Sequence, residues 1–208
     1  MRNFNFDVVI PSHRPQLAEE ARVSMSPIQP IMFINSGYPS FSKLINDCIL
    51  RAKKEIVIIC NDKARPSALD EFRTVDLLGQ GFGFVALHNF RHFGFHKDLI
   101  RRIGFFDERY EGGEYEDFDF LRRIQEADIA VYMSKEGPCV ELACSWNNQK
   151  TKVFNHLKWR EHGDHTVRLM ADEPRKYDLG EIKGTKCKTW KESKWLQDNV
   201  PKEFLCVS

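Results

Sequence analysis

A chain of 208 residues with 42% hydrophobic content can bury one substantial core, so its length suggests one domain or two closely fused halves. Its 31 basic and 30 acidic residues leave a net charge of +1, which offers no strong field to attract nucleic acid or an anionic membrane. No window approaches the ~18 apolar residues that a membrane span requires, and the N-terminus lacks the pattern of a signal peptide. We therefore expect a soluble, unsecreted protein with no nucleic-acid partner and no membrane span.

The six cysteines include no CxxC pair, and two of them lie in apolar segments, where a thiol acts as a small hydrophobic side chain. We expect them to be reduced, as in a cytoplasmic protein. The same spacing argues against a structural zinc site.

Strands and helices alternate along the first part of the chain. Short apolar runs, each bounded by turn residues, predict strands at 6–10, 31–34 and 55–60. Helices are predicted at 16–23 and 41–52, the second with Ser40 as its N-cap and Lys53-Lys54 in its last turn. The third strand lacks polar alternation, as expected when helices cover both faces. This order predicts an α/β fold with a mostly parallel sheet flanked by helices.

Polar segments at 11–15, 35–39 and 61–66 each follow one of these strands. Because the carboxyl ends of parallel strands meet at one edge of a sheet, we expect Ser12, Asn35 and Asp62 to surround a single cleft.

The pattern weakens from residue 66 to residue 81, where we expect a mobile connection. Beyond it the sequence predicts strands at 82–87 and 129–133 and helices at 97–103, 116–127 and 153–161. Residues 172–208 have few apolar side chains and are expected to form a surface-wrapping extension or a linker.

Four carboxylates fall within six residues, at Glu114, Glu116, Asp117 and Asp119. Phe118, Leu121 and Ile124 follow at helical spacing, which places the cluster at the start of an amphipathic helix. Mutual repulsion makes such a cluster costly without a cation or a helix start. Two interpretations remain: a site for a metal, a phosphate-linked cation or a general base, and an acidic first turn that only complements the helix dipole.

Three histidines, His88, His92 and His96, stand four residues apart, as metal ligands can. Phenylalanines and Gly94 interrupt the set, which favours a packed aromatic segment over a zinc site.

Three segments in order carry a family resemblance. They are Asp7-Val8-Val9-Ile10-Pro11-Ser12-His13-Arg14-Pro15, then Asn46-Asp47 leading to Ile56-Val57-Ile58-Ile59-Cys60-Asn61-Asp62, and then Gly104-Phe105-Phe106-Asp107-Glu108-Arg109 leading to Glu116-Asp117 with Arg122. They resemble the inverting nucleotide-sugar glycosyltransferases of the A-type fold, especially the large family-two group. In that family the first segment cups the nucleotide base, the second ends in a metal-binding Asp-x-Asp, and the third holds the catalytic base.

The resemblance implies a single glycosyltransferase domain over 1–208, with a nucleotide-sugar-binding half at 1–65, an acceptor and catalytic half at 66–171 and the extension at 172–208. It implies a nucleoside-diphosphate sugar donor, with a UDP-sugar as the expected one, a glycan or glycoprotein acceptor, and transfer with inversion. The donor-site residues that it implies are Pro11, Ser12 and Arg14 at the base, Asn35 at the ribose or base, Lys43 near the diphosphate, and Asp62 holding Mn²⁺ or Mg²⁺. In the acidic cluster Asp117 would be the general base, while Glu116 and Asp119 would orient the acceptor or cap the helix.

The lack of an anchor makes the chain resemble the small soluble enzymes of large DNA viruses of the chlorella type, which glycosylate capsid protein. A location in the host cytoplasm would follow. The segment 63–80 could close over the donor and exclude water.

The chain departs from the family pattern at the metal site, because Cys60 stands where the family has the first Asp. A soft thiol suits manganese or magnesium poorly, so the metal would depend on Asp62 and the donor diphosphate. Without the resemblance, Asp62 is a turn residue at a strand end and Lys43 a solvated lysine.

Two rival functions remain. Nucleotidyl transfer uses a similar sheet and metal, but it requires a glycine-rich phosphate loop that Ser12-His13-Arg14-Pro15 does not provide. A nucleotide-sugar-binding module without catalysis draws support from Cys60.

Overall fold

The computed structural model describes residues 5–34, 37, 40–108, 110 and 115–134. They fall in two compact units. The first holds 5–34, 37, 44–100 and 128–134, and the second holds 40–43, 101–108, 110 and 115–127. Asn35, the helix at 153–161 and the extension at 172–208 lie outside the described residues, and the predicted division into halves stays a prediction.

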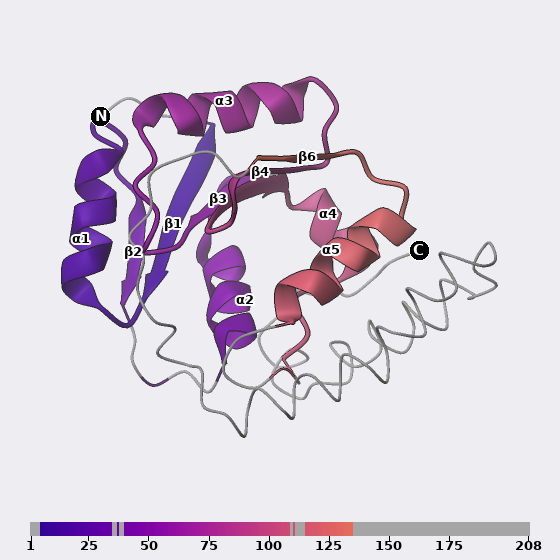
Figure 1. Ribbon diagram of the computed structural model, residues 1–208, viewed down its shortest axis with the longest axis horizontal. Coiled ribbons are helices and arrows are strands. Elements are labelled where there is room, and N and C mark those ends of the chain that lie inside the picture. The colour runs from indigo at the N-terminus through magenta and orange to yellow at the C-terminus, as the bar shows by residue number, and fades with distance from the viewer. Residues whose placement is uncertain (1–4, 35–36, 38–39, 109, 111–114, 135–208) are drawn as a thin grey trace. The chain divides into compact units, whose positions relative to one another are not determined.

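The first unit is built on a mixed sheet, formed among the described residues by six strands in the order β2-β1-β3-β5-β4-β6 (Figure 1). The strands are β1 Phe6–Ser12, β2 Ile31–Ile34, β3 Ile56–Cys60, β4 Phe84–Phe90, β5 His92–His96 and β6 Val131–Met133. All of them run in the same direction except β5, which is antiparallel to both β3 and β4. The predicted α/β fold with a mostly parallel sheet is confirmed.

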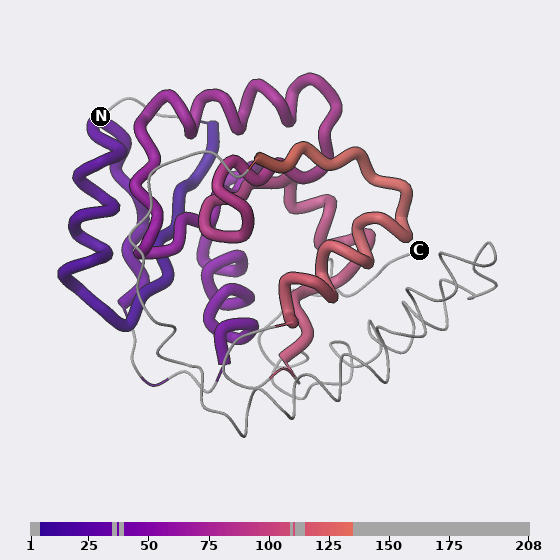
Figure 2. The backbone as a smooth tube through the Cα atoms, in the orientation of Figure 1, coloured from indigo at the N-terminus to yellow at the C-terminus, as the bar shows by residue number. Residues whose placement is uncertain are grey.

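The described helices are α1 Pro15–Ser24, α2 Phe41–Arg51, α3 Ala68–Gly79, α4 Asp98–Ile103 and α5 Glu116–Glu126. The predicted helices at 16–23, 41–52, 97–103 and 116–127 are confirmed to within a residue or two at their ends. Figure 2 traces the first crossover, from β1 through α1 to β2. No helix in the described part of the chain is long and apolar enough to cross a membrane.

The core of the first unit covers both faces of the sheet. On one face, Ile10 and Ile58 pack in a cluster with Ala21 of α1 and Leu78 of α3. Alternate residues of the same strands, such as Ile59, point to the other face and are equally buried. Burial of each such side chain contributes about 1.5–3 kcal/mol, and burial on both faces explains why these strands read as unbroken apolar runs.

The segment predicted to be a mobile connection is a helix, so the expectation for 66–81 is wrong. Helix α3 begins with a capping box, in which the backbone N–H of Ser67 donates to the Asp70 carboxylate at 2.7 Å. Its buried side includes Glu71 and Thr74 beside Leu77 and Leu78. Because polar residues occupy core-facing positions of α3, its sequence lacks the continuous apolar stripe by which an amphipathic helix is recognised.

Two predicted boundaries also differ. Strand β1 does not stop at Pro11, because it pairs with β3 only through Val9 and with β2 from Val9 to Ser12. Pro11 therefore has a neighbouring strand on one side only, where a missing N–H is tolerated. Helix α2 ends at Arg51, before Lys53-Lys54, whose backbone N–H groups donate instead to the Asp7 carboxylate at 2.5 and 2.9 Å.

Candidate functional site

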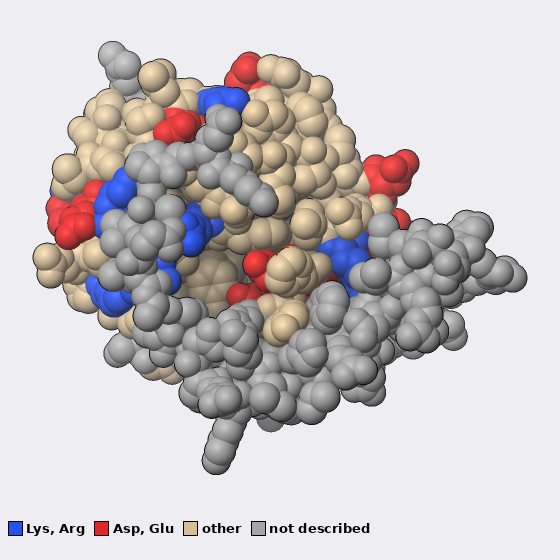
Figure 3. All heavy atoms as spheres, in the orientation of Figure 1, with Lys and Arg blue, Asp and Glu red and all other residues tan. Residues whose placement is uncertain are grey.

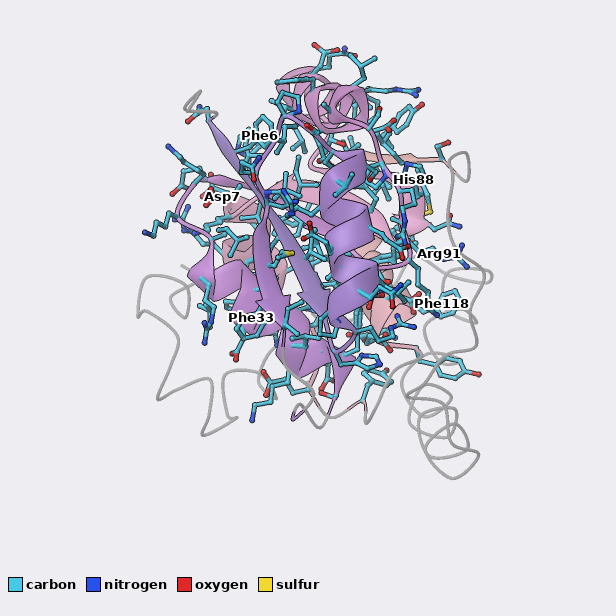
Figure 4. The ribbon with its side chains drawn as sticks, turned by 90° about the vertical axis from the view of Figure 1, so that its left-hand side faces the viewer. Phe6, Asp7, Phe33, His88, Arg91 and Phe118 are labelled. Carbon is cyan, nitrogen blue, oxygen red and sulfur yellow. The ribbon has the colours of Figure 1, made fainter. Side chains whose placement is uncertain are left out.

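The carboxyl ends of β1 and β3 meet, as the parallel pairing requires. Phe33, which pairs in register with Pro11, marks this end of the sheet in Figure 4, whereas Phe6 and Asp7 mark the opposite end. The hydroxyl of Ser12 donates to Oδ2 of Asp62 at 2.5 Å, and both residues are 2% exposed. The predicted meeting of the loops that follow β1 and β3 is confirmed.

Arg14 completes this contact. Its Nε donates to Oδ2 of Asp62 at 3.0 Å and its Nη2 to Oδ1 at 2.5 Å, a two-pronged ion pair. The backbone N–H of Arg14 donates to the Ser12 hydroxyl at 2.8 Å, which fixes the loop. The Asp62 side chain is 3% exposed and the Arg14 side chain 24% exposed, so the acid lies beneath the guanidinium.

Further basic side chains surround this pair. Arg65 donates to the backbone oxygen of Asp62 at 2.7 Å and to the Glu20 carboxylate at 2.6 Å. Partial burial lowers the pKa of His13 below its usual value, and the charges of Arg14 and Lys63 lower it further, against the opposing effect of Asp62. We call His13, Arg14, Lys63 and Arg65 the basic cluster. Lys and Arg side chains gather over the region of α1, β1 and β2 in Figure 3.

Cys60 offers nothing to a ligand at this edge. It is fully buried and belongs to the core cluster beneath α1 and α3. Burial raises the pKa of its thiol well above the usual value, and the Glu71 carboxylate raises it further. The thiol therefore stays protonated, which makes it a poor metal ligand.

The residues described do not fit a metal ion at Asp62. Both of its carboxylate oxygens are engaged by Arg14, and the neighbouring position that would supply a second ligand is Cys60. Within the described ranges, no three His, Cys, Asp or Glu side chains come together as a metal-binding group. His88, His92 and His96 thus form no such group, and the packed aromatic segment predicted for them is confirmed by buried rings such as Phe93 and Phe95.

Pro11, Lys43 and Asn35 are the other residues predicted to bind the sugar nucleotide. Pro11 is buried at the end of β1. Lys43 lies in the first turn of α2, where its backbone N–H donates to the Ser40 hydroxyl at 3.2 Å, and it belongs to the second unit. Asn35 is outside the described residues.

The second unit holds the acidic helix α5. Tyr115 precedes it with a left-handed backbone, φ 71°, and Glu116, Asp117 and Asp119 lie in its first turn. Glu116 and Asp119 are buried, whereas Asp117 is partly exposed. Oδ1 of Asp117 accepts the backbone N–H of Phe118 at 2.8 Å. Of these three carboxylates, Asp117 is the one that a ligand in solution can reach.

Asp119 lies in a buried ionic network. Its Oδ1 accepts a hydrogen bond from Arg122 at 2.9 Å and its Oδ2 one from Arg123 at 3.1 Å, while Arg123 also donates to the backbone oxygen of Ile103 at 2.6 Å. Asp119 and Arg123 are fully buried. This geometry gives Asp119 a structural role in the helix, through a buried ion-pair network that neither interpretation of the acidic cluster predicted.

The buried face of α5 differs from the predicted one. Phe118 was expected on the apolar stripe but is 58% exposed, and Phe120 is buried in its place, stacked on Phe106 with ring centroids 4.0 Å apart. Phe118 lies instead beside Tyr115, at 6.1 Å between centroids. The sequence analysis missed this aromatic pair next to Asp117. Arg123 and Asp119 are buried together, so the buried face of α5 differs from the one that the apolar residues alone predict.

Comparison with known proteins supports the fold. No protein-family model and no curated protein sequence matches the chain. Its structure resembles the mannosyltransferase PcManGT of Pyrobaculum calidifontis, solved with GDP-Man and Mn²⁺, with a TM-score of 0.55 at 12% identity over 96% of this chain and 73% of that one. It also resembles the catalytic domain of Drosophila β1,4-galactosyltransferase 7, solved with xylobiose, with a TM-score of 0.50 at 12% identity over 73% of this chain and 79% of that one. The fold is therefore that of the A-type glycosyltransferases.

Proposed function

We propose that this chain is a glycosyltransferase that moves a sugar from a nucleoside-diphosphate sugar, with UDP as the expected nucleotide, to a glycan or glycoprotein acceptor. One observation carries the proposal: the chain has an A-type fold in which the carboxyl ends of β1 and β3 carry basic side chains. The two solved structures named above are both glycosyltransferases, one bound to a sugar nucleotide and the other to a disaccharide.

The sheet edge supplies what an anionic donor requires. Open α/β sheets bind nucleotides at the carboxyl ends of their strands, and here that end carries Pro11, Ser12 and the basic cluster. Basic side chains balance the negative charge that grows on the departing diphosphate. Because the described residues do not fit a metal at Asp62, no step in this proposal passes through a metal ion.

Asp117 supplies the base. Its carboxylate removes the proton of an acceptor hydroxyl, whose oxygen attacks the anomeric carbon, and the bond between that carbon and the diphosphate breaks. The electron pair leaves with the nucleoside diphosphate. A single displacement of this kind inverts the anomeric configuration. The ring pair of the partly exposed Tyr115 and the exposed Phe118 offers an apolar surface for the acceptor sugar beside the base.

A nucleotide-sugar-binding module without catalysis is the second candidate, favoured by the burial of Cys60 where the family has a metal ligand. The cytoplasmic location and the viral capsid acceptor stay predictions from the sequence.

The test incubates the whole chain with UDP-sugars and GDP-mannose, with and without xylobiose, in EDTA and in manganese. We expect glycosylated acceptor together with free nucleoside diphosphate, and a product whose anomeric proton coupling reports inversion. Nucleotide binding without any product in either condition would favour the binding module. A product that retains the donor configuration would exclude the single displacement.

A further inference from the structure

The two partners of the ion pair between Arg14 and Asp62 differ in their exposure to solvent. The carboxylate is the buried partner, at 3% side-chain exposure, and the guanidinium is the accessible one, at 24%. Ser12 adds a third donor to the carboxylate at 2.5 Å. Both carboxylate oxygens of Asp62 thus accept hydrogen bonds from the protein. A ligand that approaches this point meets the positive charge of the Arg14 guanidinium.

A metal ion would have to break this arrangement in order to use Asp62. Both oxygens would need to leave a two-pronged, charge-assisted contact, which is among the stronger hydrogen-bonding geometries in proteins. The guanidinium would then lose its only carboxylate partner among the described residues. Since Cys60 faces the core, no second ligand among the described residues would offset that loss.

Arg14 retains the means to bind a phosphate. A guanidinium has five N–H donors in a fixed fork, and Asp62 takes one from Nε and one from Nη2. Among the described residues, Nη1 of Arg14 makes no hydrogen bond, so its two donors remain for a ligand. Arginine pairs with phosphate through two parallel hydrogen bonds, and a side chain already held by Asp62 loses little freedom on binding.

The surrounding charge favours the same ligand. Arg14, Lys63 and Arg65 bring three permanent cations to this edge, against the two carboxylates Asp62 and Glu20. The excess is positive before His13 is counted, so an anion is attracted there without the help of a metal ion.

We propose that Asp62 is a positioning residue rather than a metal ligand, and that the Arg14 guanidinium it holds binds the donor diphosphate directly. This inference rests on the proposed function, because it names the group that meets the diphosphate of that donor. It moves Arg14 from the base, where the family resemblance placed it, to the phosphates.

The experiment is calorimetric titration of the whole chain with uridine, UMP and UDP, in EDTA and again in manganese. We expect UDP to bind in EDTA. Arg14→Gln should weaken UDP binding in EDTA by about ten- to a hundredfold, the value of a charge-assisted hydrogen bond, and should leave uridine binding unchanged. Arg22→Gln, on an arginine of α1 whose side chain is 30% exposed and pairs with Glu19, is the matched control and should bind UDP as the unmodified chain does.

Asp62→Asn separates a positioning residue from a metal ligand. If Asp62 holds Arg14, the variant weakens UDP binding in EDTA, and the ratio between the affinities in manganese and in EDTA stays as in the unmodified chain. If Asp62 binds a metal, the variant leaves binding in EDTA unchanged and removes the gain from manganese, which overturns the inference. Asp76→Asn, on the exposed side of α3, is the matched control.

Arg14→Lys covers the case in which Asp62→Asn does not fold, because it keeps the charge beside Asp62. The fork is lost, so we expect an affinity for UDP between those of Arg14→Gln and the unmodified chain. Equal affinity of the unmodified chain and Arg14→Gln for UDP in EDTA would refute the inference and leave the proposed function standing. Failure of the unmodified chain to bind any nucleotide in either condition would refute both.

Discussion

The acidic run at the start of α5 separates residue by residue into different chemical roles. Asp117 is partly exposed, whereas Asp119 is enclosed by Arg122 and Arg123. The sequence could predict the cluster and the helix but not which carboxylates are buried. A carboxylate and a guanidinium that form an ion pair can both be buried at positions where helical periodicity predicts apolar residues.

Asp119→Asn should reduce stability far more than any other substitution in the acidic run. The change leaves two buried guanidinium groups without their shared charge, and breaking such a network typically costs about 3–5 kcal/mol. Urea unfolding measures the change in free energy, and Asp128→Asn, at an exposed position after α5, is the control. A stably folded Asp119→Asn that has lost only its turnover would transfer the role of base to Asp119.

Phe118→Ala tests whether the ring pair of Tyr115 and Phe118 contacts the acceptor sugar. The Phe118 ring is 58% exposed, so Phe118→Ala should change the free energy of unfolding by no more than about 0.5 kcal/mol. If Phe118 contacts the acceptor, its loss should raise the KM for the acceptor several-fold and leave donor affinity unchanged. Phe72→Ala, on an exposed ring of α3, is the comparison. Identical acceptor KM values in the two variants would remove Phe118 from the acceptor site.

Cys48 and Cys60 should be unreactive in the native protein. Burial raises the pKa of both thiols, so the reactive thiolate is scarce in either residue at pH 8. Mass spectrometry after iodoacetamide treatment should find both unmodified in the folded chain and modified in urea. Rapid native alkylation of Cys60 would show that it faces the sheet edge and not the core.

At the scale of elements, the sequence predicted every described strand except β5, and most helices, because apolar runs and Ser40 mark them directly. It missed α3, since Glu71 and Thr74 occupy positions on its buried side. The reason for Glu71 lies far along the chain: Nε2 of His92 on β5 lies 3.0 Å from its carboxylate, and both side chains are fully buried. A contact between residues so distant in sequence produces no local pattern from which the burial of Glu71 could be predicted.

Glu71→Ala should therefore destabilise the attachment of α3 to the sheet. The substitution leaves the His92 ring nitrogen without its partner in the core, a loss of about 1–3 kcal/mol before any cavity is counted. Thermal or urea unfolding measures this loss, with Glu20→Ala, at an exposed position of α1, as the comparison. Equal stability of the two variants would mean that the buried pair contributes nothing.

At the scale of the whole molecule, the sequence predicted a mostly parallel α/β sheet because strands and helices alternate. It did not predict β5 as a strand, although one compact unit holds both β1–β3 and β4–β6. Strand β5 runs antiparallel between β3 and β4 and joins the two sets of strands. Two strands joined by a tight turn are antiparallel, and here the backbone N–H of Arg91 donates to the His88 oxygen at 3.2 Å across Asn89, whose φ is 54°. The sequence analysis interpreted 88–96 as a packed aromatic segment and did not predict this turn.

The central claim is that the chain transfers sugar with Asp117 as its base, and the most direct measurement is the turnover of Asp117→Asn beside the unmodified chain. General-base loss typically costs about a hundred- to ten-thousand-fold in rate, whereas loss of an acidic residue in a helix's first turn costs about 1 kcal/mol of stability. We predict a fall in kcat of at least a hundredfold with UDP affinity and melting temperature nearly unchanged, and normal turnover for Asp128→Asn. Turnover of Asp117→Asn within threefold of the unmodified chain would contradict the account.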